Sequence, residues 1–353
     1  MRILIYGAGA IGCYLGGHLA LAGHEVTLLG RRPLAQAIAS DGLSLRLVSG
    51  PQKVPRIRIC TGLAEALQPA SYGWIAFTMK AYDTVPAIHD LQSALDDVPP
   101  IACFQNGVGN EESLTAAFGE DKIVAATITT PVSVLTPGTV IEEKRQGVAI
   151  ASDSPSFQMV LTSLQSTSLA VSVVQQSASL KWSKLLFNML GNVIPAILDR
   201  TPLAVYQERR LFGLEMSALR EAVAIAKLQS IPLVNLPGIP ARLLAMLTRW
   251  LPNFLLQPIL LPRVASGRGE KLPSLLAALR AGDKRTEVAW LNGAVAQAAR
   301  AMDRLAPINH ALALTLSDIV SGRDSWDSYR YDPTRLWSSI AVARGLDGWW
   351  YGE

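Results

Sequence analysis

Cysteine and histidine are scarce in this chain, which has three cysteines and four histidines among 353 residues. Cys13, Cys60 and Cys103 lie too far apart for the paired spacing of a zinc site, and an odd number of thiols does not make a disulfide framework. The histidines have no metal-ligand spacing either, so we predict no metal centre. Unpaired thiols are typical of a reducing compartment, and we expect the protein in the cytoplasm.

Charged residues are also few, at 17% of the chain, and the formal net charge is only +4. The arginines are scattered and form no basic stripe with interleaved aromatic residues, which argues against nucleic acid as a partner. Half of the residues are hydrophobic, and this composition excludes a disordered chain. A chain of this length is too long for one ordinary core and predicts two domains.

No apolar run is long enough to cross a bilayer without interruption. The most membrane-like segment is residues 243–262. Three prolines and the polar residues Arg249, Asn253 and Gln257 break it into short pieces, so we expect no stable membrane insertion. The segment is typical of a helical hairpin packed on the core or on a second subunit. The alternatives are an apolar lid over a site and a patch that contacts lipid or a greasy substrate.

The start of the chain has the pattern of one βαβ unit. Residues 2–6 are an apolar run that stops at a glycine, as a buried parallel strand does. The sequence GAGAIG follows at 7–12 and opens a stretch of helical spacing that ends at Gly23. Residues 24–30, HEVTLLG, predict a second strand. A strand, a glycine turn, a helix and a strand therefore follow one another directly.

The alternation of strands and helices continues through the first half of the chain. Residues 74–80, 101–107 and 122–130 predict further apolar strands with helical segments between them. We therefore expect an open, mainly parallel sheet with helices on its faces. Residues 136–143 with 147–152 suggest a hairpin at the far edge of that sheet, next to a last strand before residue 175.

Beyond a polar joint at 175–179 the strand signals vanish. Helical patterns separated by proline and glycine cover residues 178–198, 202–230, 240–262, 272–303 and 308–321. The predicted fold class is an α/β Rossmann-type N-terminal domain with a mainly parallel sheet, residues 1–176, followed by an all-α C-terminal domain, residues 177–353.

The glycine turn predicts a dinucleotide site. Gly7 permits the tight turn, Gly9 lets the backbone approach a pyrophosphate, and Gly12 lets the helix pack close to the strand. The N-terminus of the helix, with Ala10 and Ile11 in its first turn, faces the negative charge. A lone G-x-G-x-x-G is weak evidence, but within a βαβ unit and directly after the first strand it is a strong signal.

The end of the second strand indicates which dinucleotide binds. An acidic residue there would accept the ribose 2′-hydroxyl of NAD, but the sequence reads Gly30-Arg31-Arg32. A guanidinium grips a 2′-phosphate with two hydrogen bonds, so Arg31 predicts NADP(H) as the cofactor. The alternative is that both arginines are solvated loop charges.

Polar residues also follow other predicted strands at their carboxyl ends, where ligands bind in open α/β sheets. Lys80 ends the strand of residues 74–80, and Asn106 lies in FQNGVGNEE, whose glycines let the chain turn tightly beside a ligand. We take both as candidate ligand-binding residues. The alternative for Lys80 is an ordinary surface lysine.

Residues 183–192, SKLLFNMLGN, place a lysine in an otherwise apolar run. On a continuous helix, Lys184, Asn188 and Asn192 would fall near one stripe. Burying the amine without a partner would be strongly unfavourable, so this stripe faces either a site or solvent. In the second case Lys184 would simply extend its ammonium to the surface.

Five segments in this order resemble the ketopantoate reductase (2-dehydropantoate 2-reductase) family: the N-terminal GxGxxG, MKAYDT, FQNGVGNEE, KWSKLLFNMLGNVIPAIL and KRTEVAWLNG. The resemblance covers residues 1 to about 320. It implies reduction of the 2-keto group of ketopantoate to (R)-pantoate by NADPH, in pantothenate biosynthesis. It also implies a Rossmann domain and a helical domain like the C-terminal domain of 6-phosphogluconate dehydrogenase, with the site between them.

The resemblance further implies a role for individual residues. Lys184 would be the catalytic lysine and Glu287 a carboxylate that faces the substrate. Other implied substrate contacts are Asn106, Asn188, Asn192 and Ser274, the last with one extra residue allowed near Asp283; implied cofactor contacts are Arg31, Lys80 and Asn106. Hydride arriving at a ketone carbon places negative charge on its oxygen, which an ammonium donor within about 3 Å stabilises and protonates.

The substrate side departs from the family pattern. Lys271 and Ala278 stand where family members commonly have an asparagine and an aspartate. We expect a small-molecule 2-oxo acid, ketopantoate first, with a bulkier or more hydrophobic 2-oxo acid as the alternative. A nucleotide-sensing protein without turnover is a second alternative. If the protein forms a homodimer, the apolar helical domain is the expected interface.

Overall fold

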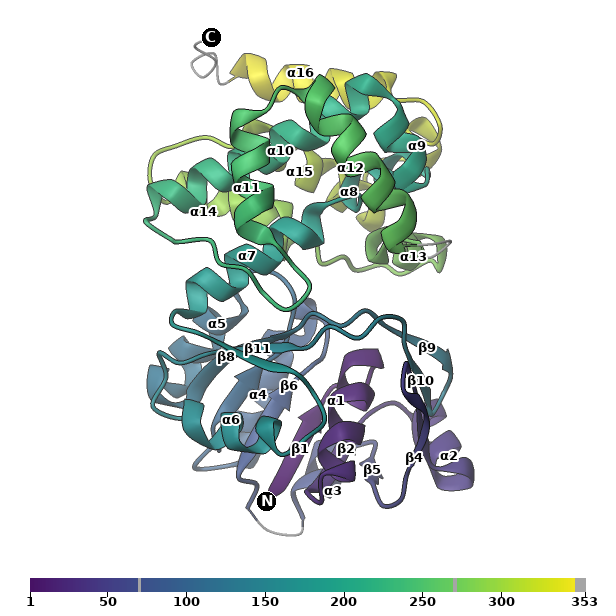
Figure 1. Ribbon diagram of the computed structural model, residues 1–353, viewed down its shortest axis with the longest axis vertical. Coiled ribbons are helices and arrows are strands. Elements are labelled where there is room, and N and C mark those ends of the chain that lie inside the picture. Colours follow the sequence, from purple (N-terminus) through teal and green to yellow (C-terminus); the bar gives the residue numbers. More distant parts are fainter. Residues whose placement is uncertain (69–70, 269–271, 347–353) are drawn as a thin grey trace. The chain divides into compact units, whose positions relative to one another are not determined.

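The computed structural model describes most of the chain, namely residues 1–68, 71–268 and 272–346 (Figure 1). The chain forms two compact units. The first consists of residues 1–184 and 234–240, and the second of residues 185–233 and the chain from Ala241 onward. The units divide inside helix α7 (Ser177–Met189), later in the chain than the domain boundary that we predict after residue 176.

An eight-stranded sheet lies at the centre of the first unit. Its strand order is β12-β11-β8-β7-β6-β1-β2-β5, and neighbouring strands are parallel except β8 and β11. Its strands are β1 (Arg2–Tyr6), β2 (Glu25–Leu29), β5 (Arg58–Cys60), β6 (Trp74–Phe77), β7 (Ile101–Cys103), β8 (Ile123–Ile128), β11 (Val148–Ala151) and β12 (Val171–Val174). The mainly parallel sheet expected from the sequence is confirmed.

Both faces of this sheet are covered by helices, as the apolar character of its strands requires. In β1, Ile3 and Ile5 belong to one core cluster and Leu4 to the other, because successive side chains point to opposite faces. The first cluster takes residues from α1 (Ala10–Leu21) and α6 (Phe157–Gln165). The second takes residues from α4 (Thr84–Ala94) and α5 (Asn110–Phe118).

The strand order reverses beside β1. From β1 the chain proceeds to β2 and β5 on one side, and it then returns to β6 on the other side of β1. In open α/β sheets, ligands bind at such a reversal, outside the carboxyl ends of the strands. The glycine turn follows β1, and Thr78 to Lys80 follow β6, so both segments lie at this point.

A second, four-stranded sheet in the first unit corrects one prediction. It has the order β4-β3-β10-β9, from β3 (Leu43–Leu47), β4 (Gly50–Val54), β9 (Val132–Thr136) and β10 (Thr139–Glu142). The segment 136–143 therefore pairs with β9 and β3, not with 147–152 at the edge of the large sheet. Leu43, Leu45 and Val140 join the core cluster of α1, and this burial decides where the strands pack.

Every element that the structure describes in the second unit is helical (Figure 1). After the last residues of α7, its α-helices are α8 (Val193–Leu198), α9 (Pro202–Gln207), α10 (Arg209–Leu228), α11 (Ala241–Trp250), α12 (Asn253–Arg268), α13 (Ser274–Arg280), α14 (Asn292–Arg300), α15 (Pro307–Ser321) and α16 (Thr334–Leu346). Helix α15 packs against α8, α10, α14 and α16, so it lies at the centre of the unit. The helical second half expected from the sequence is confirmed.

Most of the long helical patterns are nevertheless interrupted. The pattern over 178–198 divides into α7 and α8, because Gly191 takes a left-handed conformation with φ +54°. The pattern over 240–262 divides at Leu251 and Pro252 into α11 and α12. In the described part of the chain, no helix combines the length and apolar character that crossing a membrane requires.

Candidate active site

The glycine turn after β1 is tightly packed at two of its three glycines. Gly7 has φ +105°, and a Cβ placed there would lie 2.3 Å from the Met79 nitrogen. A Cβ on Gly12 would lie 2.4 Å from the Gly7 carbonyl oxygen and 2.8 Å from Thr78 Oγ1. A Cβ on Gly9, by contrast, would meet no atom within 4 Å. The backbone at Gly9 therefore faces open space, as close approach of a ligand requires.

Hydrogen bonds fix this turn to its neighbours. Thr78 Oγ1 donates to the carbonyl oxygen of Gly7 at 2.8 Å, which joins the end of β6 to the turn. The backbone nitrogen of Ala8 donates to the Leu29 carbonyl at 2.9 Å, which joins the turn to the end of β2. Gly9 is the N-cap of α1, and Ala10, Ile11 and Gly12 form the first turn of the helix. The predicted cofactor residues of this turn thus share one rigid edge.

Arg31 follows β2 at the same edge. It is the N-cap of α2 (Arg32–Asp41), and its side chain is exposed. The preceding Gly30 donates its backbone N–H to the Cys60 carbonyl at 3.0 Å, which holds the end of β2 against β5. The guanidinium therefore starts from a fixed backbone beside the glycine turn.

Lys80 and Asn106 are both exposed residues on loops that follow β6 and β7. The buried side chain of Gln105 connects the two loops, because its Nε2 donates to the Met79 carbonyl at 3.1 Å and to Thr84 Oγ1 at 2.9 Å. Asn110 Nδ2 donates to the Asn106 carbonyl at 3.0 Å. The two candidate residues thus stand on loops that buried amides hold in place.

Lys181, which the sequence analysis missed, is buried at the end of β7. Its ammonium donates to the carbonyl oxygens of Cys103 at 3.0 Å and Gln105 at 2.9 Å, and it forms an ion pair with Glu111 at 2.6 Å. Burial is the largest single influence and lowers the pKa of Lys181, but the negative charge of Glu111, its hydrogen bond and the further negative charge of Glu112 together raise the pKa above its ordinary value. The available signal was a second lysine in α7, one helical turn before Lys184 and between the apolar residues Leu180 and Trp182.

Lys184 is partly exposed and belongs to the first unit, together with the glycine turn, Lys80 and Asn106. Asn188 follows one turn later on α7 and is also partly exposed. Asn192 is not on this helix, since α7 ends at Met189 and Asn192 is the N-cap of α8. The single stripe of three residues expected from a continuous helix is therefore wrong at its last member.

Asn192 is buried, at 5% exposure, and its amide bonds to the backbone on both sides. Its Nδ2 donates to the Asn188 carbonyl at 3.0 Å, and its Oδ1 accepts from the backbone nitrogen of Leu275 at 3.2 Å. The second bond holds the N-terminus of α13, where Ser274 is exposed as the first residue. The break between α7 and α8 is further held by Glu215, which accepts from the backbone N–H of Gly191.

Glu287, the other predicted catalytic residue, is buried at 9% exposure. It is the N-cap of a short 3-10 helix (Val288–Trp290) that precedes α14. Among the two positions that depart from the family pattern, Ala278 lies on α13, whereas Lys271 lies outside the described residues.

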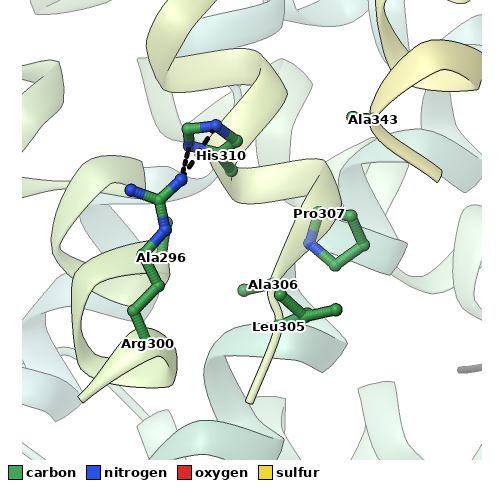
Figure 2. A pocket seen from close by; sticks show the side chains of 7 residues that line it. All are labelled: Ala296, Arg300, Leu305, Ala306, Pro307, His310 and Ala343. Atoms are coloured by element: carbon green, nitrogen blue, oxygen red, sulfur yellow. Dashed lines mark hydrogen bonds between the residues drawn. The ribbon is translucent and has the colours of Figure 1, made fainter. Parts of the chain in front are cut away.

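A cavity of about 220 Å³ in the second unit contains none of the predicted residues (Figure 2). It lies among α14, α15 and α16 and is lined by Ala296, Arg300, Leu305, Ala306, Pro307, His310 and Ala343. Arg300 donates to the His310 ring at 3.1 Å, so the two polar groups of this lining are engaged with each other. We therefore do not take this cavity as the candidate active site.

Two family models match the chain. Residues 3–154 match the family described as "Ketopantoate reductase PanE/ApbA", and residues 177–319 match "Ketopantoate reductase PanE/ApbA C terminal". A 2-dehydropantoate 2-reductase of Pyrococcus horikoshii is 27% identical over 318 residues, which cover 88% of this chain and 95% of that protein. One of Halobacterium salinarum is 26% identical over 322 residues, which cover 89% and 97%.

Solved structures with similar folds include a PanE/ApbA family ketopantoate reductase from Ralstonia eutropha JMP134. Its TM-score is 0.75 at 24% identity, over 92% of this chain and 99% of that one. A ternary structure of D-mandelate dehydrogenase with NADH and anilino(oxo)acetate has a TM-score of 0.74 at 18% identity, over 91% and 99%. At these identities the two structures are evidence of the shared fold.

Proposed function

This chain belongs to the ketopantoate reductase family, and on that premise we propose that it reduces 2-dehydropantoate to (R)-pantoate with NADPH, as a step of pantothenate biosynthesis. At the coarser level it is a nicotinamide-dependent oxidoreductase that acts on CH–OH groups and reduces 2-keto acids. The finer assignment of substrate, NADPH and a lysine acid is our proposal.

One observation supports the proposal most directly: α7 is attached to the carboxyl edge of the sheet that carries the dinucleotide turn. Lys181 donates to two carbonyl oxygens at the end of β7, and Lys184 follows one turn later, about 4.5 Å along the helix axis. The amine of Lys184 therefore starts from the edge at which parallel α/β sheets bind their ligands.

We assign the proton transfer to Lys184. When bound, NADPH supplies the hydride, and the ketone oxygen of the substrate gains negative charge. The Lys184 ammonium stabilises this charge and then gives the oxygen a proton from Nζ, which leaves a neutral amine to be reprotonated by water. Its partial exposure allows that reprotonation.

The residues of the turn fit the cofactor. The open backbone at Gly9 and the first turn of α1 suit a pyrophosphate, and no acidic residue separates β2 from Arg31. We propose that Arg31 binds the 2′-phosphate of NADPH and that Lys80 and Asn106 contact the cofactor, Asn106 also the substrate. The family further suggests Asn188, Asn192, Ser274 and Glu287 as substrate contacts, and these four roles stay proposals.

The deciding experiment measures NADPH oxidation by the purified full chain with ketopantoate, and with a longer aliphatic and an aromatic 2-oxo acid. We expect the highest kcat/KM for ketopantoate. A higher kcat/KM for a bulkier acid would make that acid the proposed substrate in place of ketopantoate and would leave the proposed reaction, reduction of a 2-oxo acid, unchanged. No oxidation with any of the three, combined with tight NADPH binding, would replace the reductase by a nucleotide-sensing protein.

Location and assembly stay proposals as well. We propose a cytoplasmic protein whose homodimer, where it forms, uses the helical unit. Met246, Trp250 and Phe254 support this, because these apolar side chains on α11 and α12 are 51%, 70% and 73% exposed. Sedimentation of the wild type and of Trp250→Lys tests it, and a monomeric wild type would refute the dimer.

A further inference from the structure

Lys181 and Glu111 form a buried ion pair for which the proposed chemistry has no use. Lys181 is 4% exposed, and the side chain of Glu111, in the first turn of α5, is 12% exposed. An ammonium carries three hydrogens, and two carbonyl oxygens and one carboxylate oxygen surround this one within 3.0 Å. Because the ammonium is buried and donates to two backbone carbonyls beside the carboxylate, Lys181 is no proton donor to a substrate.

The bonds of Lys181 reach the segments that carry the candidate site. Its partners Cys103 and Gln105 are the last residue of β7 and the residue directly before Asn106. Through the Gln105 side chain the same network reaches Met79, directly before Lys80.

Glu111 extends the network through the helix that begins after Asn106. Asn110, its neighbour at the start of α5, donates from Nδ2 to the Asn106 carbonyl. Thr84 Oγ1 lies 3.2 Å from Asn110 Oδ1 and 2.9 Å from Gln105 Nε2. A single buried polar cluster thus holds the backbone on both sides of Asn106.

We propose that Lys181 and Glu111 are positioning residues that set the distance and orientation of Lys184 relative to the loop of Asn106. This inference rests on the proposed reductase function of Lys184. Lys181 lies one turn before Lys184 on α7, so its bonds to the β7 end hold the helix at that turn. A shift of about 1 Å between an acid and its substrate is enough to reduce turnover markedly, which gives this attachment its effect on the reaction.

Stability alone does not require such a pair. Replacing a buried ion pair by apolar residues of similar volume is often neutral or stabilising, whereas removing one partner leaves an uncompensated buried charge. A variant that lacks only one of the two charges therefore combines a loss of protein stability with a displacement of Lys184. Removing both charges separates the two effects.

The test compares the wild type with Lys181→Met, Glu111→Leu and the double variant. Thermal unfolding, NADPH affinity, and kcat and KM for the 2-oxo acid are measured for each. We expect both single variants to lose thermal stability and the double variant to regain most of it. In the double variant kcat should stay at least about tenfold below wild type while NADPH affinity changes less than about threefold. Recovery of kcat together with stability would overturn the proposal.

A lysine–carboxylate pair at the opposite edge of the sheet, more exposed than Lys181 and Glu111, serves as a control for position. Lys122 also pairs with a carboxylate, Asp97, and donates to a carbonyl oxygen, that of Val98 at 3.0 Å, but it precedes β8 at the amino ends of the strands. Lys122→Met should leave kcat within about twofold of wild type. An equal loss of kcat in this variant would show that any such pair affects turnover and would overturn the specific role of Lys181.

A conservative variant and a hydrogen-exchange experiment provide two further tests of the proposal. Lys181→Arg retains a cation against Glu111 but replaces the three-donor ammonium by a planar fork, so we expect a folded protein with kcat reduced at least about fivefold. Wild-type kcat in this variant would contradict the proposal. Hydrogen exchange at the amides of residues 104–110 tests the attachment without any turnover, and we expect faster exchange in the double variant.

The exchange experiment also separates the two hypotheses. If the wild type reduces no 2-oxo acid, the reductase function fails, and the attachment is then judged by exchange alone. Unchanged exchange in the double variant would refute the attachment whatever the activity.

Discussion

Three of the predicted ligand-binding residues in the first unit and two of those in the second unit are held differently. In the first unit, Arg31, Lys80 and Asn106 are exposed, and the groups that hold them are buried backbone and amide partners. In the second unit, Asn192 and Glu287 are themselves buried, and Asn192 bonds to the backbone at both ends of its amide. Exposed residues on a fixed frame are suited to binding, whereas a buried residue with backbone partners first serves the fold.

The largest expected effect tests the exposed side of this comparison. Lys184→Ala should lower kcat by about 100-fold or more, because the ketone oxygen loses its proton donor. NADPH affinity, measured by fluorescence titration, should change little, since the glycine turn is intact. A variant with unchanged kcat would remove Lys184 from the reaction.

Substitutions in the glycine turn test how tightly the backbone is packed at the carboxyl edge of the large sheet. Gly7→Ala should lower the free energy of unfolding by about 2–4 kcal/mol, because the new Cβ meets the Met79 backbone and the residue must keep a positive φ. Gly9→Ala is the control: it should stay within about 1 kcal/mol of wild type yet weaken NADPH binding about tenfold. Denaturant titration and NADPH titration of both variants measure this. Equal stability losses in the two variants would contradict the difference in packing between Gly7 and Gly9.

Arg31 tests whether an exposed residue at the edge is a ligand contact or a solvated charge. Arg31→Ala should weaken NADPH binding about 10-fold to 100-fold and NADH binding by less than about threefold, because only NADPH carries the 2′-phosphate. Arg32→Ala, the neighbouring exposed arginine, is the control and should alter neither affinity by more than about threefold. Parallel losses for both dinucleotides in Arg31→Ala would favour the solvated charge.

The asparagines on either side of the break between α7 and α8 sharpen the comparison within the second unit. Asn192→Ala should lower the free energy of unfolding by about 2 kcal/mol, since two buried backbone groups lose their partner. Asn188→Ala, at a partly exposed position, should cost less than about 1 kcal/mol and act mainly on kcat/KM. Denaturant unfolding and steady-state kinetics measure the two effects, and the reverse order would contradict this assignment.

The smallest effect concerns His18 of the first unit, which is buried as Asn192 and Glu287 of the second unit are. Burial lowers its pKa from 6.5 to about 4. The unfolded chain therefore binds a proton at this residue more readily than the folded one. The contribution of neutral His18 to the free energy of unfolding is fully present above pH 6.5 and is lost as the pH falls from 6.5 to about 4. Between about pH 7 and 6 the loss should stay below about 1 kcal/mol. Unfolding of His18→Gln should lack this component of the pH dependence, and an identical pH profile would show that another group titrates.

The sequence predicted the large sheet of the first unit better than the small sheet or the helix ends of the second unit, for a physical reason. Strands of a parallel sheet are buried on both faces, so they appear as short apolar runs, and the residues after them are marked by glycine and polar side chains. The predictions for the glycine turn, Arg31, Lys80 and Asn106 rest on this local pattern, and their binding roles stay proposals. The second sheet was mispredicted because its strands are half-buried and pair over long separations, as β10 does with β3.

In the helical unit the local signals are less complete. A helical pattern does not show where a helix stops when Gly191 takes a positive φ, and this break moved Asn192 off the stripe of Lys184. Lys181 was missed because its partners, Cys103, Gln105 and Glu111, are about 70 to 80 residues away along the chain. No local pattern reports such a distant partner.

By itself the sequence determined an α/β first half with a mainly parallel sheet, a helical second half, the glycine turn and the chemical types available for catalysis, because these depend on residues within a few positions of one another. Tertiary structure decided which of two lysines on one helix is buried in an ion pair and which stays accessible. That choice depends on a carboxylate and two carbonyl oxygens from distant segments, which compensate a buried charge only when the folded chain brings them together.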